Sequence, residues 1–447
     1  MSKKSKIISI SLLVLLLILV LVIRACCNPN VAFAVGPRWM VLSAAEPDLP
    51  RCIYERDTLI ATSTVTQAVV EAAATKVNPA ATVTSTSILS GGDGKSLVAT
   101  VFTFSGVDPV QVAPFVPGTS PNYLFVPTMG WTFGPGGDPK AHGVPANTPP
   151  MNPTFSGRIT VVDTGLDLPA AANTSGATVP VLDRSAMPAG APKEVTDGID
   201  AGHGTFVASL LQRMLPKAAV TVLQVPSTVG TVTVKNESWK ASLSDLRSVL
   251  SVLANPKVAG SFLNLSMGTY GCPTARKDLP PLGKGLSYPA DDSWRAPLAV
   301  LDVLTGSQAP QRTFAAAGND MVDQPFYPAA WAACGQTGNA VFGCPTAPTS
   351  TSTNRIVAVG SDKCAADCIA HGPLRLGPDK QTFSNVGNWV TRPGIEGADV
   401  IGWRSADQSN AAAGWYSWAG TSFATPCALA IEVSNKPAGT TSCGLKN

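Results

Sequence analysis

Near its end the chain reads Gly420-Thr421-Ser422-Phe423-Ala424-Thr425-Pro426, and the apolar run Cys427-Ala428-Leu429-Ala430-Ile431 follows directly. A glycine before a serine, with small residues and a proline behind it, is typical of a tight turn that leads into a helix. Ser422 is therefore predicted at a helix N-terminus, where unpaired backbone N–H groups and the helix dipole favour negative charge. This position makes Ser422 a candidate nucleophile, although Gly-Thr-Ser also occurs in ordinary helix caps.

The chain from residue 157 onward alternates apolar strands with helical patterns. Helical spacing of apolar residues occurs from Val207 to Met214 and from Leu246 to Leu253. Buried strands are predicted at residues 159–162, 219–225, 262–265, 313–317 and 355–359. This alternation indicates an α/β fold, a doubly wound parallel sheet flanked by helices, over residues 157–447.

In such a sheet, binding and catalytic residues lie at the carboxyl ends of the strands. Polar residues of this chain are predicted at the same places. Asp163 ends the first strand, His203 opens a helix, and Asn319 follows a later strand. Each residue alone is more typical of a turn or a cap. Together with Ser422 they favour a catalytic site, because a nucleophilic serine needs a base and a carboxylate that orients the base.

The motifs that contain these residues resemble those of the subtilisin-like serine proteases. Val161-Val162-Asp163-Thr164-Gly165 is similar to the aspartate motif of that family, and residues 202–208 to its histidine motif; residues 420–426 are similar to its serine motif. Residues 265–268 resemble its substrate-binding strand, and residues 315–320 its oxyanion-asparagine loop. The order Asp, His, Ser differs from the order in chymotrypsin-like and α/β-hydrolase enzymes.

Carried over to this chain, the resemblance implies Ser422 as nucleophile, His203 as general base and then acid, and Asp163 as the group that fixes the imidazole. Asn319 and the backbone N–H of Ser422 would form the oxyanion hole. An extended polypeptide substrate is expected as an added strand along Ser266-Met267-Gly268. The implied protein is a serine endopeptidase.

Two other functions remain open from the sequence. One is a catalytically silent protein that keeps the fold for binding or as a scaffold, and the other is a peptide ligase whose acyl-enzyme is captured by an amine. The resemblance implies no required cofactor. Members of the family often bind structural calcium, but no calcium loop is legible in this chain.

Residues 50–128 carry a second pattern, in the order strand, helix, strand, strand, helix, strand. Thr64 and Gln67 are predicted to form a capping box, and Val65, Val69, Ala73 and Val77 recur at helical spacing. The strands are predicted at 59–62, 82–89, 97–104 and 123–126, and the second helix at 108–115. The order is that of a small α+β ferredoxin-like domain.

The family resemblance gives this small domain two alternative roles. It is either a propeptide that inhibits the enzyme until it is cut away, or a retained accessory domain. For a propeptide, cleavage is expected between Pro127 and Gly157. Residues 129–156 are rich in glycine and proline and are predicted to be an exposed linker.

The N-terminal 34 residues are predicted to be a targeting segment. Lys3, Lys4 and Lys6 precede an apolar run at residues 7–23, which is typical of a membrane anchor or a signal peptide. A lipoprotein modified at Cys26 is a third alternative. Each alternative makes the remaining chain extracytoplasmic, either secreted or anchored to the membrane.

The net charge of +3, with 14% charged and 45% hydrophobic residues, describes a globular protein and does not indicate a nucleic-acid partner.

The chain has ten cysteines, and the eight that follow Cys26 and Cys27 are an even number, which favours disulfides in an exported chain but leaves 105 pairings open. Cys334 and Cys344 are the favoured pair because they bracket a Gly/Thr-rich loop, and Cys443 is predicted to hold the C-terminal tail.

Cys364, Cys368 and His371 have the spacing of a partial metal site. They lack a fourth ligand nearby and the export route is oxidising, so no metal is expected there.

Overall fold

The structure is a computed structural model of the whole chain. It describes residues 32–33, 39–42, 52–90, 97–127, 139–145, 148–169, 176–198, 200–234, 237–272, 279–320, 322–334, 341–344, 355–362, 384–385, 387–406, 412–437 and 439–446. The apolar run 7–23 and the group Cys364, Cys368 and His371 lie outside these residues. Within them, no helix has the length and hydrophobicity needed to cross a bilayer.

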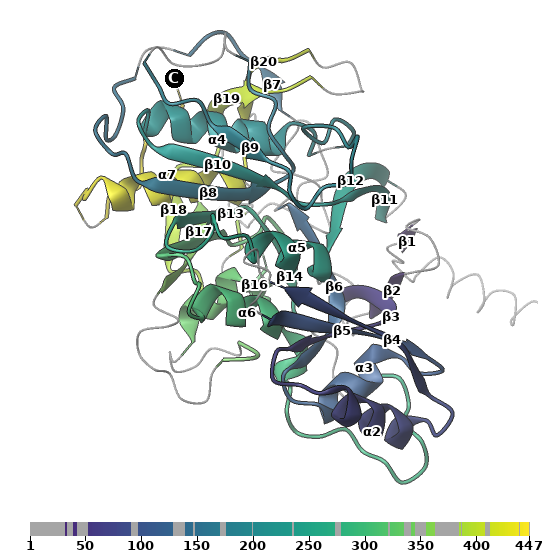
Figure 1. The fold of residues 1–447 in the computed structure, drawn as a ribbon. Helices are drawn as coiled ribbons and strands as arrows, with labels where there is room; N and C mark the ends of the chain where they lie inside the picture. The colour runs from purple at the N-terminus through teal and green to yellow at the C-terminus, as the bar shows by residue number, and fades with distance from the viewer. Residues whose placement is uncertain are drawn as a thin grey trace, which may run out of the picture.

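The larger part of the fold is a seven-stranded sheet in the order β18-β17-β15-β13-β8-β10-β9, with every neighbouring pair parallel. This confirms the predicted parallel α/β sheet (Figure 1). The strands span Arg158–Asp163 (β8), Val181–Asp183 (β9), Ala219–Gln224 (β10), Phe262–Leu265 (β13), Arg312–Ala316 (β15), Ile356–Ser361 (β17) and Arg392–Ile395 (β18).

Both faces of the parallel sheet are covered, which explains why its strands read as continuous apolar runs. Along β17, Val357 and Val359 join the core beneath helices α4 and α7, whereas Ile356 and Ala358 join the core beneath α5 and α6. The helices span His203–Met214 (α4), Leu246–Leu253 (α5), Leu298–Thr305 (α6) and Thr421–Val433 (α7).

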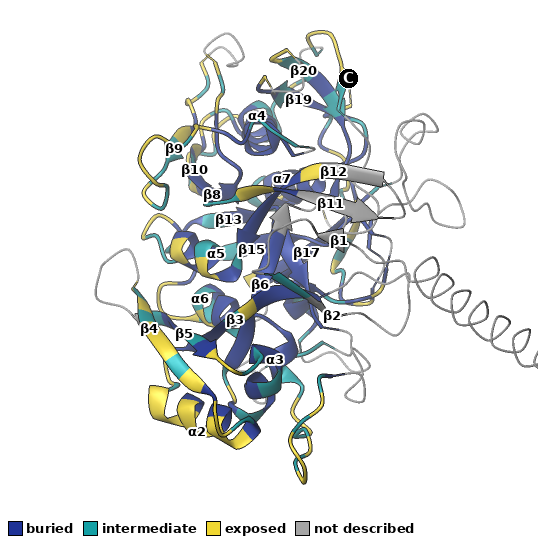
Figure 2. Cartoon of the chain, turned by 90° about the vertical axis from the view of Figure 1, so that its right-hand side faces the viewer, coloured by how far each residue is buried: buried dark blue, intermediate teal, exposed yellow. Residues whose placement is uncertain are grey.

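The N-terminal unit is an antiparallel sheet in the order β6-β3-β5-β4 with the helices α2 and α3 (Figure 1). α2 and β4 are its exposed outer parts (Figure 2). Its elements span Cys52–Thr62 (β3), Gln67–Val77 (α2), Thr82–Ser90 (β4), Leu97–Ser105 (β5), Pro109–Val112 (α3), Ala113–Phe115 (η1) and Thr119–Pro127 (β6).

The predicted capping box at the start of α2 is wrong. The N-cap is Thr66, which makes no side-chain cap bond, and the side chain of Gln67 instead donates to Glu71. The buried face of the helix also differs in part from the predicted one. Val69 is half exposed, whereas Val70 is buried.

The N-terminal unit does not stand apart from the parallel sheet. β6 pairs antiparallel with β12 through Phe125 and Leu124, and with β14 through Pro127 and Val126. Both units also share one continuous hydrophobic core. The remaining strands are Ala32–Phe33 (β1), Trp39–Leu42 (β2), Lys140–Ala141 (β7), Thr228–Val234 (β11), Glu237–Asp245 (β12), Met267–Tyr270 (β14), Phe326–Tyr327 (β16), Val400–Arg404 (β19) and Gly414–Trp418 (β20).

Three of these strands, β19, β20 and β7, form a separate small sheet that the sequence did not predict. β7 lies inside the predicted linker and pairs with Tyr416 and Ser417 of β20. His142 continues the contact by donating its backbone N–H to Trp415 O at 2.8 Å. The linker is therefore fixed to the parallel-sheet domain at this point.

Disulfides join three cysteine pairs among the described residues. Cys334–Cys344 is present as predicted, and Cys427–Cys443 ties the C-terminal tail to α7 as expected. The third disulfide, Cys52–Cys272, was not predicted. It links β3 of the N-terminal unit to the segment that directly follows β14. The two units are thus joined by a covalent bond besides the backbone.

Replacing both Cys52 and Cys272 with serine is expected to lower the free energy of unfolding by about 2–5 kcal/mol, because the bond closes a loop of 220 residues in the unfolded chain. Chemical denaturation of the oxidised protein measures the change. The Cys334→Ser/Cys344→Ser variant is the control, since its loop spans a separation of 10 and its loss should be smaller. Equal losses would contradict the expectation.

Candidate active site

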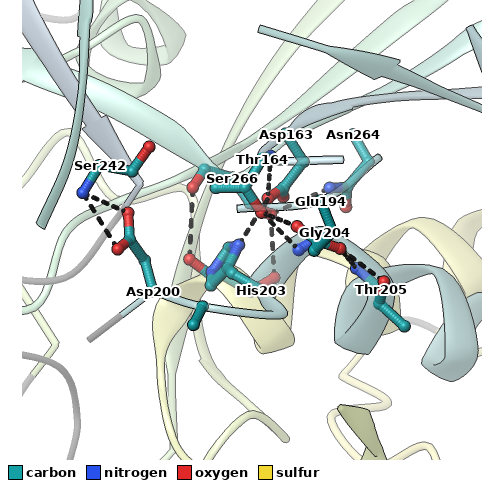
Figure 3. Close-up of polar contacts among 12 residues, drawn as sticks. Asp163, Thr164, Glu194, Asp200, His203, Gly204, Thr205, Ser242, Asn264 and Ser266 are labelled. Atoms are coloured by element: carbon teal, nitrogen blue, oxygen red, sulfur yellow. Dashed lines mark hydrogen bonds and ion pairs between the residues drawn. The ribbon is translucent and has the colours of Figure 1, made fainter. Parts of the chain in front are cut away.

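Asp163 and His203 form a buried pair at the carboxyl edge of the parallel sheet. Asp163 ends β8 and His203 is the first residue of α4, and their side chains are about 1% exposed. His203 Nδ1 donates to Asp163 Oδ1 at 2.7 Å (Figure 3). The two elements can meet because residue 204 is glycine: a Cβ there would lie 2.3 Å from Gly165 O.

This hydrogen bond fixes the tautomer of the neutral imidazole, so Nε2 carries the lone pair that a general base needs. Nε2 is buried and has no hydrogen-bond partner among the described residues. The ring packs against Phe423 at 5.3 Å between centroids and edge-on to Trp418 at 5.9 Å. Phe423 follows Ser422 in the chain, so the imidazole contacts the first turn of the helix that carries the predicted nucleophile.

Ser422 is the second residue of α7, as its sequence predicted. Its hydroxyl donates to Ser266 O at 3.3 Å, and the Ser266 hydroxyl donates to Ser422 O at 3.0 Å. Asn264 Nδ2 donates in turn to Ser266 Oγ at 2.9 Å. The structure therefore places Ser422 and Ser266 together but forms no hydrogen bond between Ser422 and His203 Nε2. Such catalytic bonds often shorten only when substrate binds.

Asn319 lies beside the turn that begins α7. Its Oδ1 accepts from Thr421 N at 2.9 Å, and Gly318 N donates to Thr421 Oγ1 at 3.1 Å. The bond from Thr421 N fixes the oxygen of the Asn319 amide at this turn, and a Cβ on Gly420 would lie 3.5 Å from Asn319 Nδ2. The structure therefore brings the Asn319 side chain to the first turn of α7, the turn that carries Ser422.

The strand predicted to bind substrate is already paired with part of the chain itself. Met267 lies opposite Pro127, and Gly268 lies opposite Val126, in an antiparallel ladder. β6 continues from there to pair with β12. Residues 124–127 therefore occupy the place of an added strand between β12 and β14, directly beside Ser266.

Two further buried carboxyl groups approach the imidazole. Asp200 accepts from Ser242 N with both oxygens, at 3.0 and 2.8 Å, and Glu194 accepts from Thr164 and Thr205. Burial raises the pKa of Glu194 to about 7 and that of Asp200 to about 7. Both carboxyl groups therefore gain their negative charge as the pH rises through neutrality.

His203 responds to all of these charges. Burial alone would lower the pKa of His203, but the charge and hydrogen bond of Asp163, with the charges of Asp200 and Glu194, raise the pKa above the usual 6.5. The site therefore stabilises the imidazolium form of His203. No group of metal-binding side chains occurs among the described residues.

The sequence analysis missed Glu194 and Asp200. Asp200 lies just before Gly202-His203, and an acidic residue so close to a candidate base is a signal that could have been used. Glu194 lies in an irregular segment without apolar periodicity, and no local pattern marks it. Only the pairing of Glu194 with Gly165 brings it to the site.

Comparison with known proteins returns proteases among solved structures. No family model matches the sequence, and no curated protein matches it either. PagA, a prenylagaramide maturation protease, is 19% identical over 63% of this chain and 75% of its own, with a TM-score of 0.33. A variant of the protease domain of PatA is 18% identical over 65% and 81%, with a TM-score of 0.34. A cold-adapted subtilisin-like serine proteinase is 18% identical over 67% and 83%, with a TM-score of 0.35.

The solved structures that this chain is similar to are thus proteases, one of which is described as subtilisin-like. The TM-scores do not place individual residues in correspondence. The assignment of residues to roles therefore depends on the contacts described above.

The raised pKa of His203 can be measured directly. The chain has three histidines, and NMR titration of imidazole resonances, assigned with His142→Gln and His371→Gln variants, is expected to give a pKa for His203 above 6.5. Asp163→Asn should lower this pKa, because it removes the two largest contributions that raise it. A pKa of His203 that is the same in both proteins would show that the Asp163 carboxylate does not act on the imidazole.

Proposed function

We propose that this protein is an exported serine endopeptidase that hydrolyses peptide bonds through an acyl-enzyme on Ser422. The observation that carries the proposal is the buried pair of Asp163 and His203 at 2.7 Å, with the imidazole packed on the residue after Ser422. This arrangement joins the three parts of the chain whose motifs resemble those of the subtilisin-like proteases.

In the proposed reaction, the Ser422 hydroxyl attacks the scissile carbonyl while His203 Nε2 accepts its proton. Asp163 holds the tautomer through Nδ1 and stabilises the imidazolium. His203 then gives the proton to the leaving amine, and water repeats the sequence to release the acyl group. The Asn319 side-chain amide and the Ser422 backbone N–H are proposed to stabilise the oxyanion.

Ser422→Ala is expected to reduce casein hydrolysis by about a millionfold, the loss known for subtilisin when its serine is removed. The purified protein and the variant are compared in the same digestion assay. Ser434→Ala, at the far end of α7, is the matched control and should retain activity. Hydrolysis that survives Ser422→Ala would refute the assignment.

Two assays on the same purified protein distinguish the proposed protease from the two alternative functions. A fluorophosphonate should label Ser422 in an enzyme, whereas a catalytically silent scaffold need not react. Mass spectrometry of peptide products distinguishes hydrolysis from ligation, because an amine nucleophile gives a joined peptide. His203 Nε2, which has no hydrogen-bond partner among the described residues, favours the enzyme, since a buried nitrogen without a partner does not help to hold the fold together.

We further propose that the N-terminal unit is a ferredoxin-like domain that inhibits the site. The antiparallel order β6-β3-β5-β4 supports this fold. Residues 124–127 support the inhibition, because they pair with β12 and β14 where an extended substrate would bind. Asn122 Oδ1 also accepts from Arg247 N at the start of α5, which fixes the unit in this register.

Self-cleavage is expected between Pro127 and Gly157, and the Cys52–Cys272 bond should keep both pieces together. N-terminal sequencing of the mature protein should give a start within 128–157. The pieces should separate on a gel only under reducing conditions, and Cys52→Ser should separate them without reductant. A single start at Met1 or Val35 would contradict cleavage, and separation of the unreduced wild-type protein would contradict the tether.

The place of action follows from the N-terminal segment. We propose that residues 7–23 direct the chain across a membrane and either remain as an anchor or are removed from a secreted product. The proposed chemistry uses only side chains and water, so it calls for no cofactor. Its partners are a polypeptide substrate and the chain's own N-terminal unit.

A further inference from the structure

Glu194 contacts both segments that carry the predicted catalytic pair (Figure 3). Its Oε1 accepts from the hydroxyl of Thr164, next to Asp163, at 2.5 Å. Its Oε2 accepts from Thr205, which lies in the first turn of the helix that His203 opens, through the backbone N–H at 2.9 Å and the hydroxyl at 2.5 Å. One carboxylate therefore bridges the end of β8 and the start of α4.

The backbone around Glu194 holds this bridge in register. Leu166 N donates to Lys193 O at 2.9 Å, and Val195 N donates to Thr164 O at 3.2 Å. The segment 193–195 thus runs antiparallel along the residues that follow Asp163. Glu194 is only 1% exposed, so its carboxylate is held away from water while it accepts these bonds.

The hydroxyl of Thr164 links Glu194 to the catalytic pair. It lies 2.5 Å from Glu194 Oε1 and 3.3 Å from Asp163 Oδ1, and it accepts from Gly204 N at 3.0 Å. Asp163 Oδ1 is the same oxygen that accepts from His203 Nδ1. A change in the charge of Glu194 therefore reaches the imidazole through the Thr164 hydroxyl and the Asp163 carboxylate.

We propose that Glu194 is a positioning residue of this site, which fastens the Asp163 segment to the His203 helix and stabilises the imidazolium of His203 with its charge. The inference rests on the proposed protease function. It goes beyond that function because Glu194 touches neither substrate nor the reacting atoms and acts through Thr164, Thr205 and the buried pair.

The other charged groups near Glu194 agree with this role. Asp163 on β8 and Asp200 before α4 are acidic, and His203 on α4 is the basic group that they face. Arg184, after β9, donates to Ala191 O and Gln224 rather than to Glu194. The pKa of Glu194 is raised to about 7, first by burial, so its charge appears as the pH rises through neutrality.

The test separates charge from folding. Glu194→Gln keeps the size of the side chain, and its carbonyl can still accept from Thr205 while its amide donates to Thr164 Oγ1. We expect it to lower the pKa of His203 in the NMR titration, and to move the acidic limb of kcat/KM to lower pH, by about 0.5–1 unit. Loss of the negative charge makes the imidazolium less stable, so the base is deprotonated at lower pH.

Glu396→Gln is the matched control. Glu396 is another buried carboxyl group, but its carboxylate accepts from Ser442 Oγ and from the backbone N–H groups of residues 443–445 in the C-terminal tail. We expect it to lower the melting temperature and to leave the His203 titration unchanged. A folded Glu194→Gln protein that behaves like Glu396→Gln would overturn the proposal.

A second pair of variants covers the case in which Glu194→Gln does not fold. Thr164→Val removes the hydroxyl that links Glu194 to the Asp163 segment, and Thr164→Ser keeps it. The valine variant should lower kcat about tenfold with little change in KM, and the serine variant should recover most of it. Equal kcat values in the two variants would overturn the positioning role.

The outcomes also distinguish this inference from the proposed function. A wild-type protein without protease activity, whose His203 pKa still falls in Glu194→Gln, would refute the protease and keep the coupling of Glu194 to the imidazole. An active protease whose His203 pKa and acidic limb do not move in folded Glu194→Gln would keep the function and refute the role of Glu194.

Discussion

The buried hydrogen bond between His203 and Asp163 is the interaction on which the site depends. An imidazole this deeply buried would be neutral and weakly basic if it stood alone, because burial disfavours the charged form. Asp163 reverses that preference, and Asp200 and Glu194 add to it. The result is a base whose pKa lies above its usual value in a place from which water is excluded. The cost of burying these carboxyl groups is offset by backbone and hydroxyl donors, as for Asp200 with Ser242 N.

The parallel sheet and the ends of its strands could be predicted from sequence because both depend on local signals. Continuous apolar runs such as that in β17 occur where both faces of a strand are covered, and Asp163 and His203 follow directly from a strand end and a helix start. The prediction of the capping box was wrong for a local reason. Thr64 and Thr66 are both suitable N-cap residues, and the sequence does not indicate which of them begins the helix.

Glu194 and the register of β6 could not be predicted, because each is fixed by residues far away in the chain. Glu194 reaches the site only because segment 193–195 pairs with the residues after Asp163. β6 was predicted as the last strand of the N-terminal unit. No pattern in its sequence indicates that it also pairs with β12 and β14, besides β3 of its own unit. Polar strands such as β12 lack the apolar alternation from which a strand is normally recognised.

The disulfide and the strand pairing together determine what cleavage of the linker would achieve. Cutting the backbone after β6 does not remove its pairing with β14, and the Cys52–Cys272 bond keeps the N-terminal unit attached to the domain that it covers. A tethered strand competes with substrate at an effective concentration that reaches the millimolar range for short flexible connections. Cleavage alone would therefore free the chain end but leave residues 124–127 paired with β12 and β14 for most of the time. Under the proposed function, an extended substrate would have to displace residues 124–127 by pairing better with β12 and β14, or meet a unit whose disulfide has been reduced.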